Sequence, residues 1–189
     1  MKILAFAATS SKHSINKQLI AAATRTLEAT PGTDVTVETI DLNDYEMPIY
    51  SIDRQNEDGI PQLAHDFFDK IGQADAVLIS FAEHNGFYTA AYKNLFDWTS
   101  RIDMAVYQNK PTVMLATSPG PSGGANVLRA AVESAPFFGN DVVASVSVPG
   151  FYDRFDASTQ TLTDPDLDSQ FRAALTALST STDRQEASV

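Results

Sequence analysis

Three polar or glycine-rich segments of the chain hold the residues that could bind a ligand. They cover residues 9–14, 82–88 and 117–124, and each follows a short apolar run and precedes a helical pattern. Hydroxyl groups, backbone N–H groups and glycines suit a phosphate or a flat ring, because they let the chain approach a ligand closely. Any one such segment is weak evidence. Three of them in equivalent positions predict a binding site built from loops.

The segment 9–14 reads T-S-S-K-H-S and leads into a helix that begins near residue 15. The free N–H groups and the positive dipole end of that helix favour a phosphate group, and Lys12 adds a positive charge. The alternative is that Ser14 only caps the helix. The dinucleotide pattern G-x-G-x-x-G and the P-loop pattern G-x-x-x-x-G-K-[ST] are both missing. We therefore expect the terminal phosphate of a mononucleotide here.

The other two segments are suited to a planar group. Asn85-Gly86 is a turn signal that allows positive φ, and His84, Phe87 or Tyr88 could lie against a flat heterocycle. The three glycines of 117–124 let the backbone pass under a ligand. Ordinary turns are the alternative for both segments, since Pro and Gly clusters often do nothing but turn the chain.

Alternating strand and helix patterns place these segments in space. The expected strands are 3–8, 35–40, 76–81, 112–116 and 141–148, and the expected helices are 15–29, 61–71, 89–100, 125–134 and 166–179. This alternation predicts an α/β fold, namely a flavodoxin-like, doubly wound, five-stranded parallel sheet of order 2-1-3-4-5 with helices on both faces. Ligands bind at the carboxyl ends of such strands, where all three segments fall. Residues 41–59 are expected to form a loop, and a lid over the ligand is one hypothesis for it.

Composition limits the function classes. We expect one domain over residues 1–179 and a mobile C-terminal tail over 180–189. The 189 residues carry a formal net charge of -11, which disfavours a nucleic-acid partner. The chain has no cysteine, which excludes disulfides, thiolate nucleophiles and cysteine-based metal sites, and its three scattered histidines predict no metal site. No stretch is long enough to span a membrane, so the expected location is the cytoplasm.

The motifs in these segments resemble those of the NADPH-dependent FMN reductase family, whose flavodoxin-like members include quinone, chromate and azo-dye reductases. The family's G-S-x-R-x-x-S-x-N is similar to A-T-S-S-K-H-S-I-N at 8–16. Its P-E-Y-N-G-S, followed by L-K-N-x-x-D-W, is similar to A-E-H-N-G-F at 82–87 and Y-K-N-L-F-D-W at 92–98. Its S-P-G-x-x-G-G is matched by S-P-G-P-S-G-G at 118–124.

The resemblance implies a role for each matched residue. The FMN phosphate would be surrounded by Thr9, Ser11, Ser14 and Asn16. The isoalloxazine ring would be lined, chiefly through backbone groups, by Glu83, His84, Asn85 and Gly86. The ring and ribityl chain would be held from the other side by Ser118, Pro119, Gly120 and Gly123. A helix and a subunit contact, rather than the flavin, would be fixed by Lys93, Asn94, Asp97 and Trp98.

The chain departs from the family pattern at two important positions. Ser11 stands where the motif has arginine, which removes a fixed positive charge from the phosphate site. His84 stands where the motif has tyrosine, which puts a smaller, titratable ring beside the flavin.

The function that the resemblance implies is that of an FMN-dependent NAD(P)H oxidoreductase. Hydride would pass from NADPH or NADH through bound FMN to a quinone, an azo compound, a metal oxyanion or a flavin. Flavin N5 would carry the hydride, so no catalytic side chain is expected. A homodimer or homotetramer is also implied. Two alternatives stay open at this point: a flavodoxin-like electron carrier and a non-catalytic, flavin-binding regulatory module.

Overall fold

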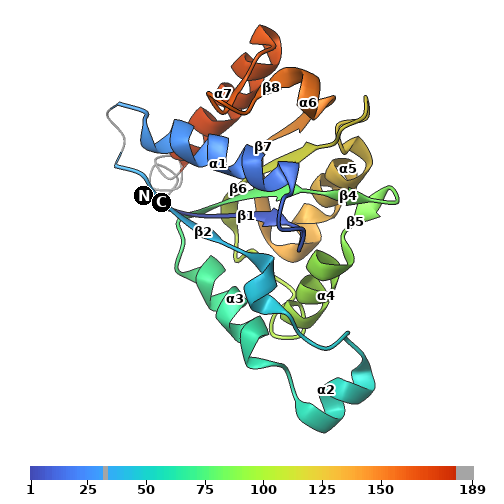
Figure 1. The fold of residues 1–189 in the computed structure, drawn as a ribbon. Helices are drawn as coiled ribbons and strands as arrows, with labels where there is room; N and C mark the ends of the chain where they lie inside the picture. The colour runs from blue at the N-terminus through green and yellow to red at the C-terminus, as the bar shows by residue number, and fades with distance from the viewer. Residues whose placement is uncertain (32–33, 182–189) are drawn as a thin grey trace.

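A five-stranded parallel sheet forms the centre of the molecule, in the order β2-β1-β3-β6-β7 (Figure 1). The computed structural model describes residues 1–31 and 34–181. The strands are β1 (Lys2–Ala8), β2 (Thr36–Ile40), β3 (Ala76–Phe81), β6 (Lys110–Thr117) and β7 (Asn140–Val148). Because β4 and β5 lie outside this sheet, β6 and β7 are its fourth and fifth strands along the chain. The predicted order 2-1-3-4-5 and the flavodoxin-like, doubly wound fold are therefore confirmed.

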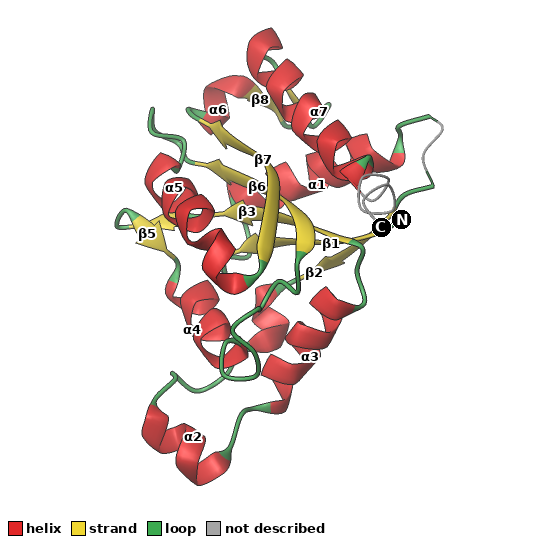
Figure 2. Cartoon of the chain, turned by 180° about the vertical axis from the view of Figure 1, so that it is seen from behind, coloured by secondary structure: helices red, strands yellow, loops and turns green. Residues whose placement is uncertain are grey.

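Helices cover both faces of this sheet (Figures 1 and 2). One face carries α1 (Ile15–Glu28) and α7 (Pro165–Ser179), and the other carries α3 (Gln62–Gly72), α4 (Ala90–Thr99) and α5 (Ala125–Ser134). In β1, Ile3 and Ala5 pack under α1 and α7, whereas Leu4 and Phe6 pack on the opposite side. Alternation along a strand places neighbours on opposite faces, and burial of both faces explains why the strand is apolar throughout.

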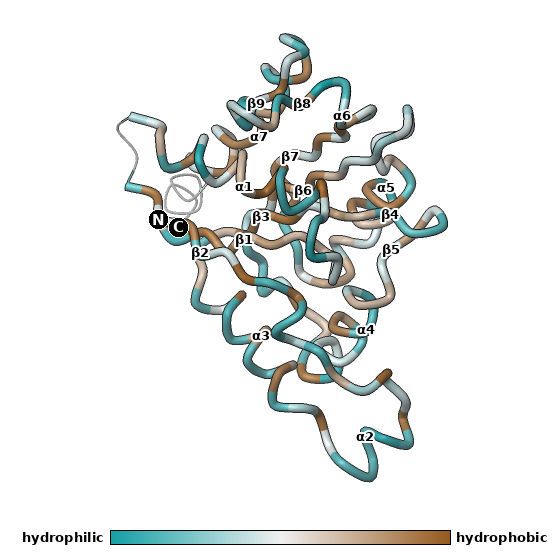
Figure 3. The backbone as a smooth tube through the Cα atoms, in the orientation of Figure 1, coloured by the Kyte–Doolittle hydropathy of each residue, from teal (hydrophilic) through white to brown (hydrophobic). Residues whose placement is uncertain are grey.

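The segment 41–59, expected to be a loop, contains two helical elements, so that expectation was wrong in part. A 3-10 turn, η1 (Leu42–Tyr45), is followed by α2 (Ile52–Asp58). The Ser51 hydroxyl caps α2 by accepting a hydrogen bond from the N–H of Arg54 at 3.2 Å. None of the seven residues of α2 is buried, and Figure 3 shows the helix as mostly hydrophilic. Without an apolar face it has no helical periodicity to detect.

Several short elements complete the fold. They are the hairpin β4 (Glu83–His84) and β5 (Phe87–Tyr88), the 3-10 turn η2 (Ala135–Phe138), α6 (Phe151–Arg154), and the pair β8 (Phe155–Asp156) and β9 (Thr161–Leu162). Of the predicted mobile tail, only Thr180 and Ser181 lie within the described residues, and the Ser181 hydroxyl donates to the Leu178 carbonyl at 2.7 Å. Across residues 1–31 and 34–181, none of the helices has the length and apolar character needed to cross a bilayer.

Candidate functional site

The three predicted segments follow three neighbouring strands. We call residues 9–14 the first loop, 82–88 the second loop and 117–124 the third loop. They follow β1, β3 and β6, which pair with one another in parallel in that order. Parallel neighbours end at one edge of a sheet, so the three loops share the carboxyl edge.

A layer of buried polar side chains lies beneath these loops, and we call it the floor. Its members are at most 2% exposed: Thr9, Asn16, Ser80, Thr89 and Thr117. The Asn16 Oδ1 atom accepts hydrogen bonds from the Ser80 hydroxyl at 2.7 Å and from the Thr117 N–H at 3.2 Å. Its Nδ2 atom donates to the Thr117 carbonyl at 3.3 Å. One amide therefore joins α1 to β3 and β6.

The threonines of the floor connect the remaining elements. The Thr89 hydroxyl donates to the Ala8 carbonyl at 2.9 Å and accepts from the N–H of Tyr92 at 3.2 Å. The Thr117 hydroxyl donates to the Val148 carbonyl at 2.7 Å. The floor thus ties the ends of β1, β3, β6 and β7 to the starts of α1 and α4, and its buried polar groups have partners.

Asn16 has a role that sequence reasoning missed. The family resemblance assigns it to the FMN phosphate, whereas the structure shows its side chain buried and bonded to β3 and β6. Direct contact with a phosphate stays a prediction. A signal for the bracing role is present in the chain: Asn16 lies three, four and seven residues before Leu19, Ile20 and Ala23, the buried face of α1.

The first loop presents polar groups to solvent. Ser14 caps α1, because its hydroxyl accepts from the Asn16 N–H at 3.1 Å. The backbone N–H groups of Ser10, Lys12 and His13 have no acceptor in the part of the chain that the structure describes. These donors stand at the positive end of a 14-residue helix. An anion would find both hydrogen bonds and a favourable dipole there.

An oxygen of Thr9 holds the first loop from below. The Thr9 hydroxyl accepts a hydrogen bond from the N–H of Ser11 at 3.1 Å. Ser11 itself is exposed. The position that the family fills with arginine therefore opens toward solvent.

The second loop is a tight hairpin. Asn85 and Gly86 both have positive φ, 51° and 81°, between the two-residue strands β4 and β5. Positive φ at both central residues is the pattern of a type I′ turn, and the predicted turn is confirmed. His84 and Phe87 are exposed, the latter at 48%. Burial raises the pKa of the Tyr88 phenol, and a hydrogen bond with Ser134 offsets this only in part.

The Glu83 side chain links the second loop to the helix that follows the third. Its Oε2 atom accepts hydrogen bonds from the N–H groups of Asn126 and Val127, both at 3.0 Å. Gly124, at the N-cap of α5, has no side chain that can do this. The residue was predicted to line the flavin chiefly through its backbone, and this capping role was missed. The signal was a helix start without a capping residue of its own.

The third loop is packed on one side and open on the other. Gly123 has a φ of 60°, and a Cβ atom there would lie 2.3 Å from the Ser147 hydroxyl and 2.8 Å from the Pro149 nitrogen. A Cβ atom on Gly120 would meet nothing within 4 Å. The Gly120 carbonyl accepts from the Gly150 N–H at 2.9 Å, which anchors the loop to the end of β7. The open side is where a ligand has room.

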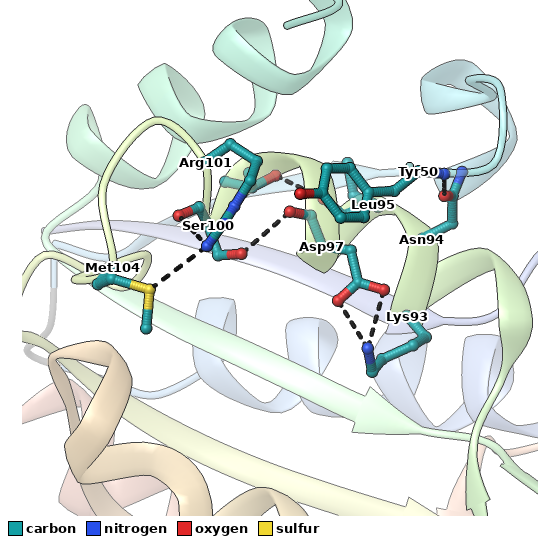
Figure 4. Close-up of polar contacts among 9 residues, drawn as sticks. Tyr50, Lys93, Asn94, Leu95, Asp97, Ser100, Arg101 and Met104 are labelled. Carbon is teal, nitrogen blue, oxygen red and sulfur yellow. Dashed lines mark hydrogen bonds and ion pairs between the residues drawn. The ribbon is translucent and has the colours of Figure 1, made fainter. Parts of the chain in front are cut away.

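Two of the four motif residues on α4, Asn94 and Trp98, hold the segment that precedes α2, as Figure 4 shows for Asn94. The Asn94 side chain donates to the carbonyls of Met47 and Pro48 at 3.1 and 3.2 Å and accepts from the Tyr50 N–H at 2.8 Å. The Trp98 indole N–H donates to the Pro48 carbonyl at 2.7 Å. Lys93 pairs with Asp97 at 2.6 Å. All four thus stabilise α4 or its contact with residues 47–50.

A cavity of about 400 Å³ lies between the first loop, η1 and the start of α4, with Ser10 and Ala90 in its wall. Next to it, the Lys17 ammonium approaches the Asp41 carboxylate to 2.6 Å. Burial acts to raise the pKa of Asp41, but the hydrogen bonds from Lys17 and the Asn43 N–H outweigh it and leave the pKa lowered. The first turn of α1 is therefore joined to the start of the 41–59 segment by an ion pair.

Comparison with known proteins gives matches of three kinds. Residues 1–152 match the model of a family described as NADPH-dependent FMN reductase. The chain is 30% identical to "Uncharacterized protein MG342 homolog" of Mycoplasma pneumoniae, over 77% of this chain and 86% of that protein. It is 35% identical to a "Quinone reductase" of Escherichia coli K12, and that match spans 42% of this chain and only 43% of the relative.

The solved structures agree on the architecture. The flavoenzyme FerB of Paracoccus denitrificans, described as an NAD(P)H:(acceptor) oxidoreductase, superposes with a TM-score of 0.72. The two sequences are 22% identical, and the alignment covers 94% of each chain. At this identity the likeness shows a common fold.

Proposed function

Because this chain belongs to the NADPH-dependent FMN reductase family, we propose that it is an FMN-dependent NAD(P)H oxidoreductase. Hydride passes from NADPH or NADH, by way of FMN, to a small acceptor: a quinone, an azo compound, a metal oxyanion or a free flavin. The observation that carries the proposal is a set of N–H donors just before α1, on Ser10, Lys12 and His13, which have no acceptor among the residues that the structure describes. They lie at the same sheet edge as two loops with room for a planar ring.

The residues at this edge fit FMN in charge and shape. The first loop offers backbone donors, dipole and the Lys12 ammonium to the phosphate. The Asn85-Gly86 turn and Gly120 leave space for a flat ring, since a Cβ atom on either glycine would meet nothing within 4 Å. Ser118 and Pro119 lie in the same loop as Gly120 and would border the ring and ribityl chain.

The side chains have positioning tasks rather than chemical ones. FMN, when bound, supplies the atom that accepts and returns hydride, which is its N5. The floor fixes the three loops relative to one another, and Glu83 holds the second loop against α5. The backbone donors of the first loop, held in place in this way, would stabilise charge without having to reorganise during the reaction. The exposed His84 and Phe87 border the space through which a donor or an acceptor reaches the ring.

The kinetics and assembly follow from the same proposal. The two substrates use one open ring face in turn, so steady-state kinetics are ping-pong, and a ternary-complex pattern would contradict this part. We expect the protein in the cytoplasm, and the family resemblance implies a homodimer or homotetramer. Ser11, in place of the family's arginine, weakens the attraction for phosphate groups.

The test is a visible spectrum of the purified protein after incubation with excess FMN and removal of free flavin. Anaerobic NADPH, and then NADH, are added to separate samples. We expect retained flavin that bleaches with at least one nucleotide. Retained flavin that resists both nucleotides would overturn the reductase and favour an electron carrier or a regulatory module. Failure to retain flavin would overturn the proposal at the level of the cofactor.

A further inference from the structure

The short helix α6 begins directly beside the third loop (Figures 1 and 2). The N–H of Gly150 donates to the Gly120 carbonyl at 2.9 Å. The N–H of Phe151 donates to the Ser118 carbonyl at 3.1 Å. Both acceptors belong to the third loop, so the start of α6 is fixed against a segment that borders the proposed flavin site. The residues that α6 exposes therefore lie close to that site.

The inner side of α6 packs on the core and holds the helix in place. Phe151 is 2% exposed, and its ring stacks on the Phe155 ring with 4.5 Å between centroids and 20° between planes. The Arg154 guanidinium donates to the Pro149 carbonyl at 3.2 Å, just before the helix begins. The backbone of α6 is therefore held in one position relative to the third loop.

Tyr152, the second residue of α6, leaves most of its side chain in water. It is 70% exposed, and its ring meets the Phe151 ring at an angle of 82° with 5.8 Å between centroids. A large aromatic ring gains free energy when it is covered, and it stacks well on another flat ring. Any nucleobase can stack in this way, because every base has a π-face. Tyr152 thus offers a stacking surface beside the proposed flavin site.

Asp153, the next residue of α6, is an exposed carboxylate without a partner. Its oxygen atoms make no hydrogen bond or ion pair with any residue that the structure describes. The carboxylates nearby are engaged instead. Asp156 accepts from the Ser158 hydroxyl at 2.6 Å, and Asp164 accepts from the N–H of Leu167 at 3.1 Å. Asp153 therefore keeps its oxygen atoms for a hydroxyl group of a ligand.

The charge around α6 limits which ligand can bind there. Residues 149–156 carry two carboxylates and one guanidinium, a net charge of -1: Asp153, Asp156 and Arg154. The guanidinium is already engaged, because its Nε atom lies 3.6 Å from the Asp164 carboxylate. A phosphate monoester carries a charge of about -1.5 to -2 at pH 7. Asp153 would repel such a group, whereas it would accept a hydrogen bond from a hydroxyl.

We propose that Tyr152 and Asp153 bind the adenosine end of the hydride donor, and that they make NADH the preferred donor over NADPH. The adenine stacks on the Tyr152 ring, and the Asp153 carboxylate accepts a hydrogen bond from the ribose 2′-OH. A carboxylate recognises this hydroxyl in dinucleotide-binding folds, and NADPH carries a phosphate in its place. The N–H of Ser122 in the third loop has no acceptor among the described residues and serves the pyrophosphate.

This inference rests on the proposed function, since it assigns a donor to the proposed reductase. It departs from the family description, which names NADPH. Ser11 supports the departure, because it stands where the family pattern has arginine. A 2′-phosphate would meet less positive charge at this edge of the sheet than the family pattern provides.

Donor fragments that carry no hydride test the inference apart from reductase activity. ADP-ribose and 2′-phospho-ADP-ribose are titrated calorimetrically into the FMN-saturated protein. We expect the wild type to bind ADP-ribose about tenfold more tightly. Asp153→Asn should narrow this preference about threefold, because it removes the charge and keeps the size. Asp141→Asn, exposed at the start of β7 on the opposite edge of the sheet, is the control and should leave it unchanged.

Equal affinities for the two fragments, a preference for the phosphorylated one, or no binding of either would overturn the inference. Its failure is distinguishable from failure of the proposed function. If the protein retains flavin that no nucleotide bleaches, the reductase is overturned, and the titrations still decide whether the adenosine site exists.

Flavin reduction kinetics test Tyr152. Tyr152→Ala should raise the KM for NADH about tenfold with little change in kcat, and Tyr152→Phe, which keeps the ring, should stay near the wild type. A benzyl dihydronicotinamide, which lacks adenosine, should reduce the flavin of Tyr152→Ala as fast as that of the wild type. Phe137→Ala, 77% exposed on η2, is the control and should leave the KM unchanged. An unchanged KM in Tyr152→Ala, or an equal loss with both donors, would overturn the role of Tyr152.

Discussion

The floor and the first loop lie one above the other at the carboxyl edge and use similar residues in opposite ways. The floor consists of buried Thr, Ser and Asn side chains whose hydrogen bonds end on protein atoms. Residues 10–13 of the first loop are exposed Ser, Lys and His residues, and the N–H groups of Ser10, Lys12 and His13 have no acceptor among the described residues. Buried polar groups must find partners within the fold, whereas exposed ones can keep their capacity for a ligand.

This difference separates stability from binding within one motif. Thr9 and Asn16 belong to the floor, whereas Ser11 lies above it, although the family pattern treats all three as phosphate neighbours. Changes in the floor should therefore act on the free energy of unfolding, and changes in the exposed loop on ligand affinity.

The largest effect is expected for Asn16→Ala. It leaves the Ser80 hydroxyl and the Thr117 N–H and C=O without partners in a dry environment, so the free energy of unfolding should fall by about 3 kcal/mol. Urea unfolding of the flavin-free protein measures it. The control, Asn56→Ala on exposed α2, should change stability by less than about 0.5 kcal/mol. Equal effects of the two variants on the free energy of unfolding would contradict the distinction between the floor and the exposed residues.

Glu83→Ala should have an intermediate effect on both the free energy of unfolding and the affinity for FMN. It removes the acceptor for two N–H groups at the start of α5, which costs about 1–2 kcal/mol of stability. The second loop also loses its attachment, so FMN affinity should fall. Urea unfolding and flavin fluorescence titration measure the two changes. Glu133→Gln, at the other end of α5, is the control and should affect neither.

Changes in the exposed first loop should alter affinity alone. Lys12→Ala should weaken FMN binding by about fivefold, or about 1 kcal/mol, and Ser11→Arg should strengthen it, because both act on the charge beside the phosphate. Titrations with FMN and with riboflavin, which lacks the phosphate, separate the causes. A similar effect on riboflavin would show that the first loop does not hold the phosphate.

The smallest effect is expected for Asp41→Asn, which breaks the half-buried pair with Lys17. The pKa of Asp41 is lowered in the fold, so its contribution is present above the ordinary value of 3.8 and disappears as the pH falls through the lower, folded value. The variant should lose a few tenths of a kcal/mol at neutral pH and match the wild type in strong acid. Melting temperatures over that pH range measure this. A loss that persists in acid would point to the η1 cap instead.

The main elements could be predicted because the burial of helices and strands imposes a regular pattern of apolar residues on the sequence. Each of the five strands and five main helices was expected within two residues of its observed ends. The strand order was expected because five strands that alternate with helices suit the flavodoxin-like order 2-1-3-4-5, although the sequence alone does not prove it. The helix α2 could not be predicted, because a helix without a buried face leaves no pattern.

The position of the site could be predicted from the sequence, but the roles of its individual residues could not. The strand ends and the Asn85-Gly86 turn identify the loops. However, the sequence cannot show that the Glu83 carboxylate turns toward α5, because that contact depends on how β3 and α5 are placed across the sheet. Asn94 and Trp98 likewise hold the segment before α2 through the carbonyls of Met47 and Pro48, more than 40 residues away along the chain.

The two glycines of the third loop have opposite consequences for anyone building a variant library of this protein. Gly123 has to stay fixed, since any side chain there would collide with backbone at Pro149. Gly120 faces open space and tolerates a side chain without displacing a neighbour. Random codons at position 120, screened for flavin retention, would show how much of that open space the ring needs while sparing the scaffold.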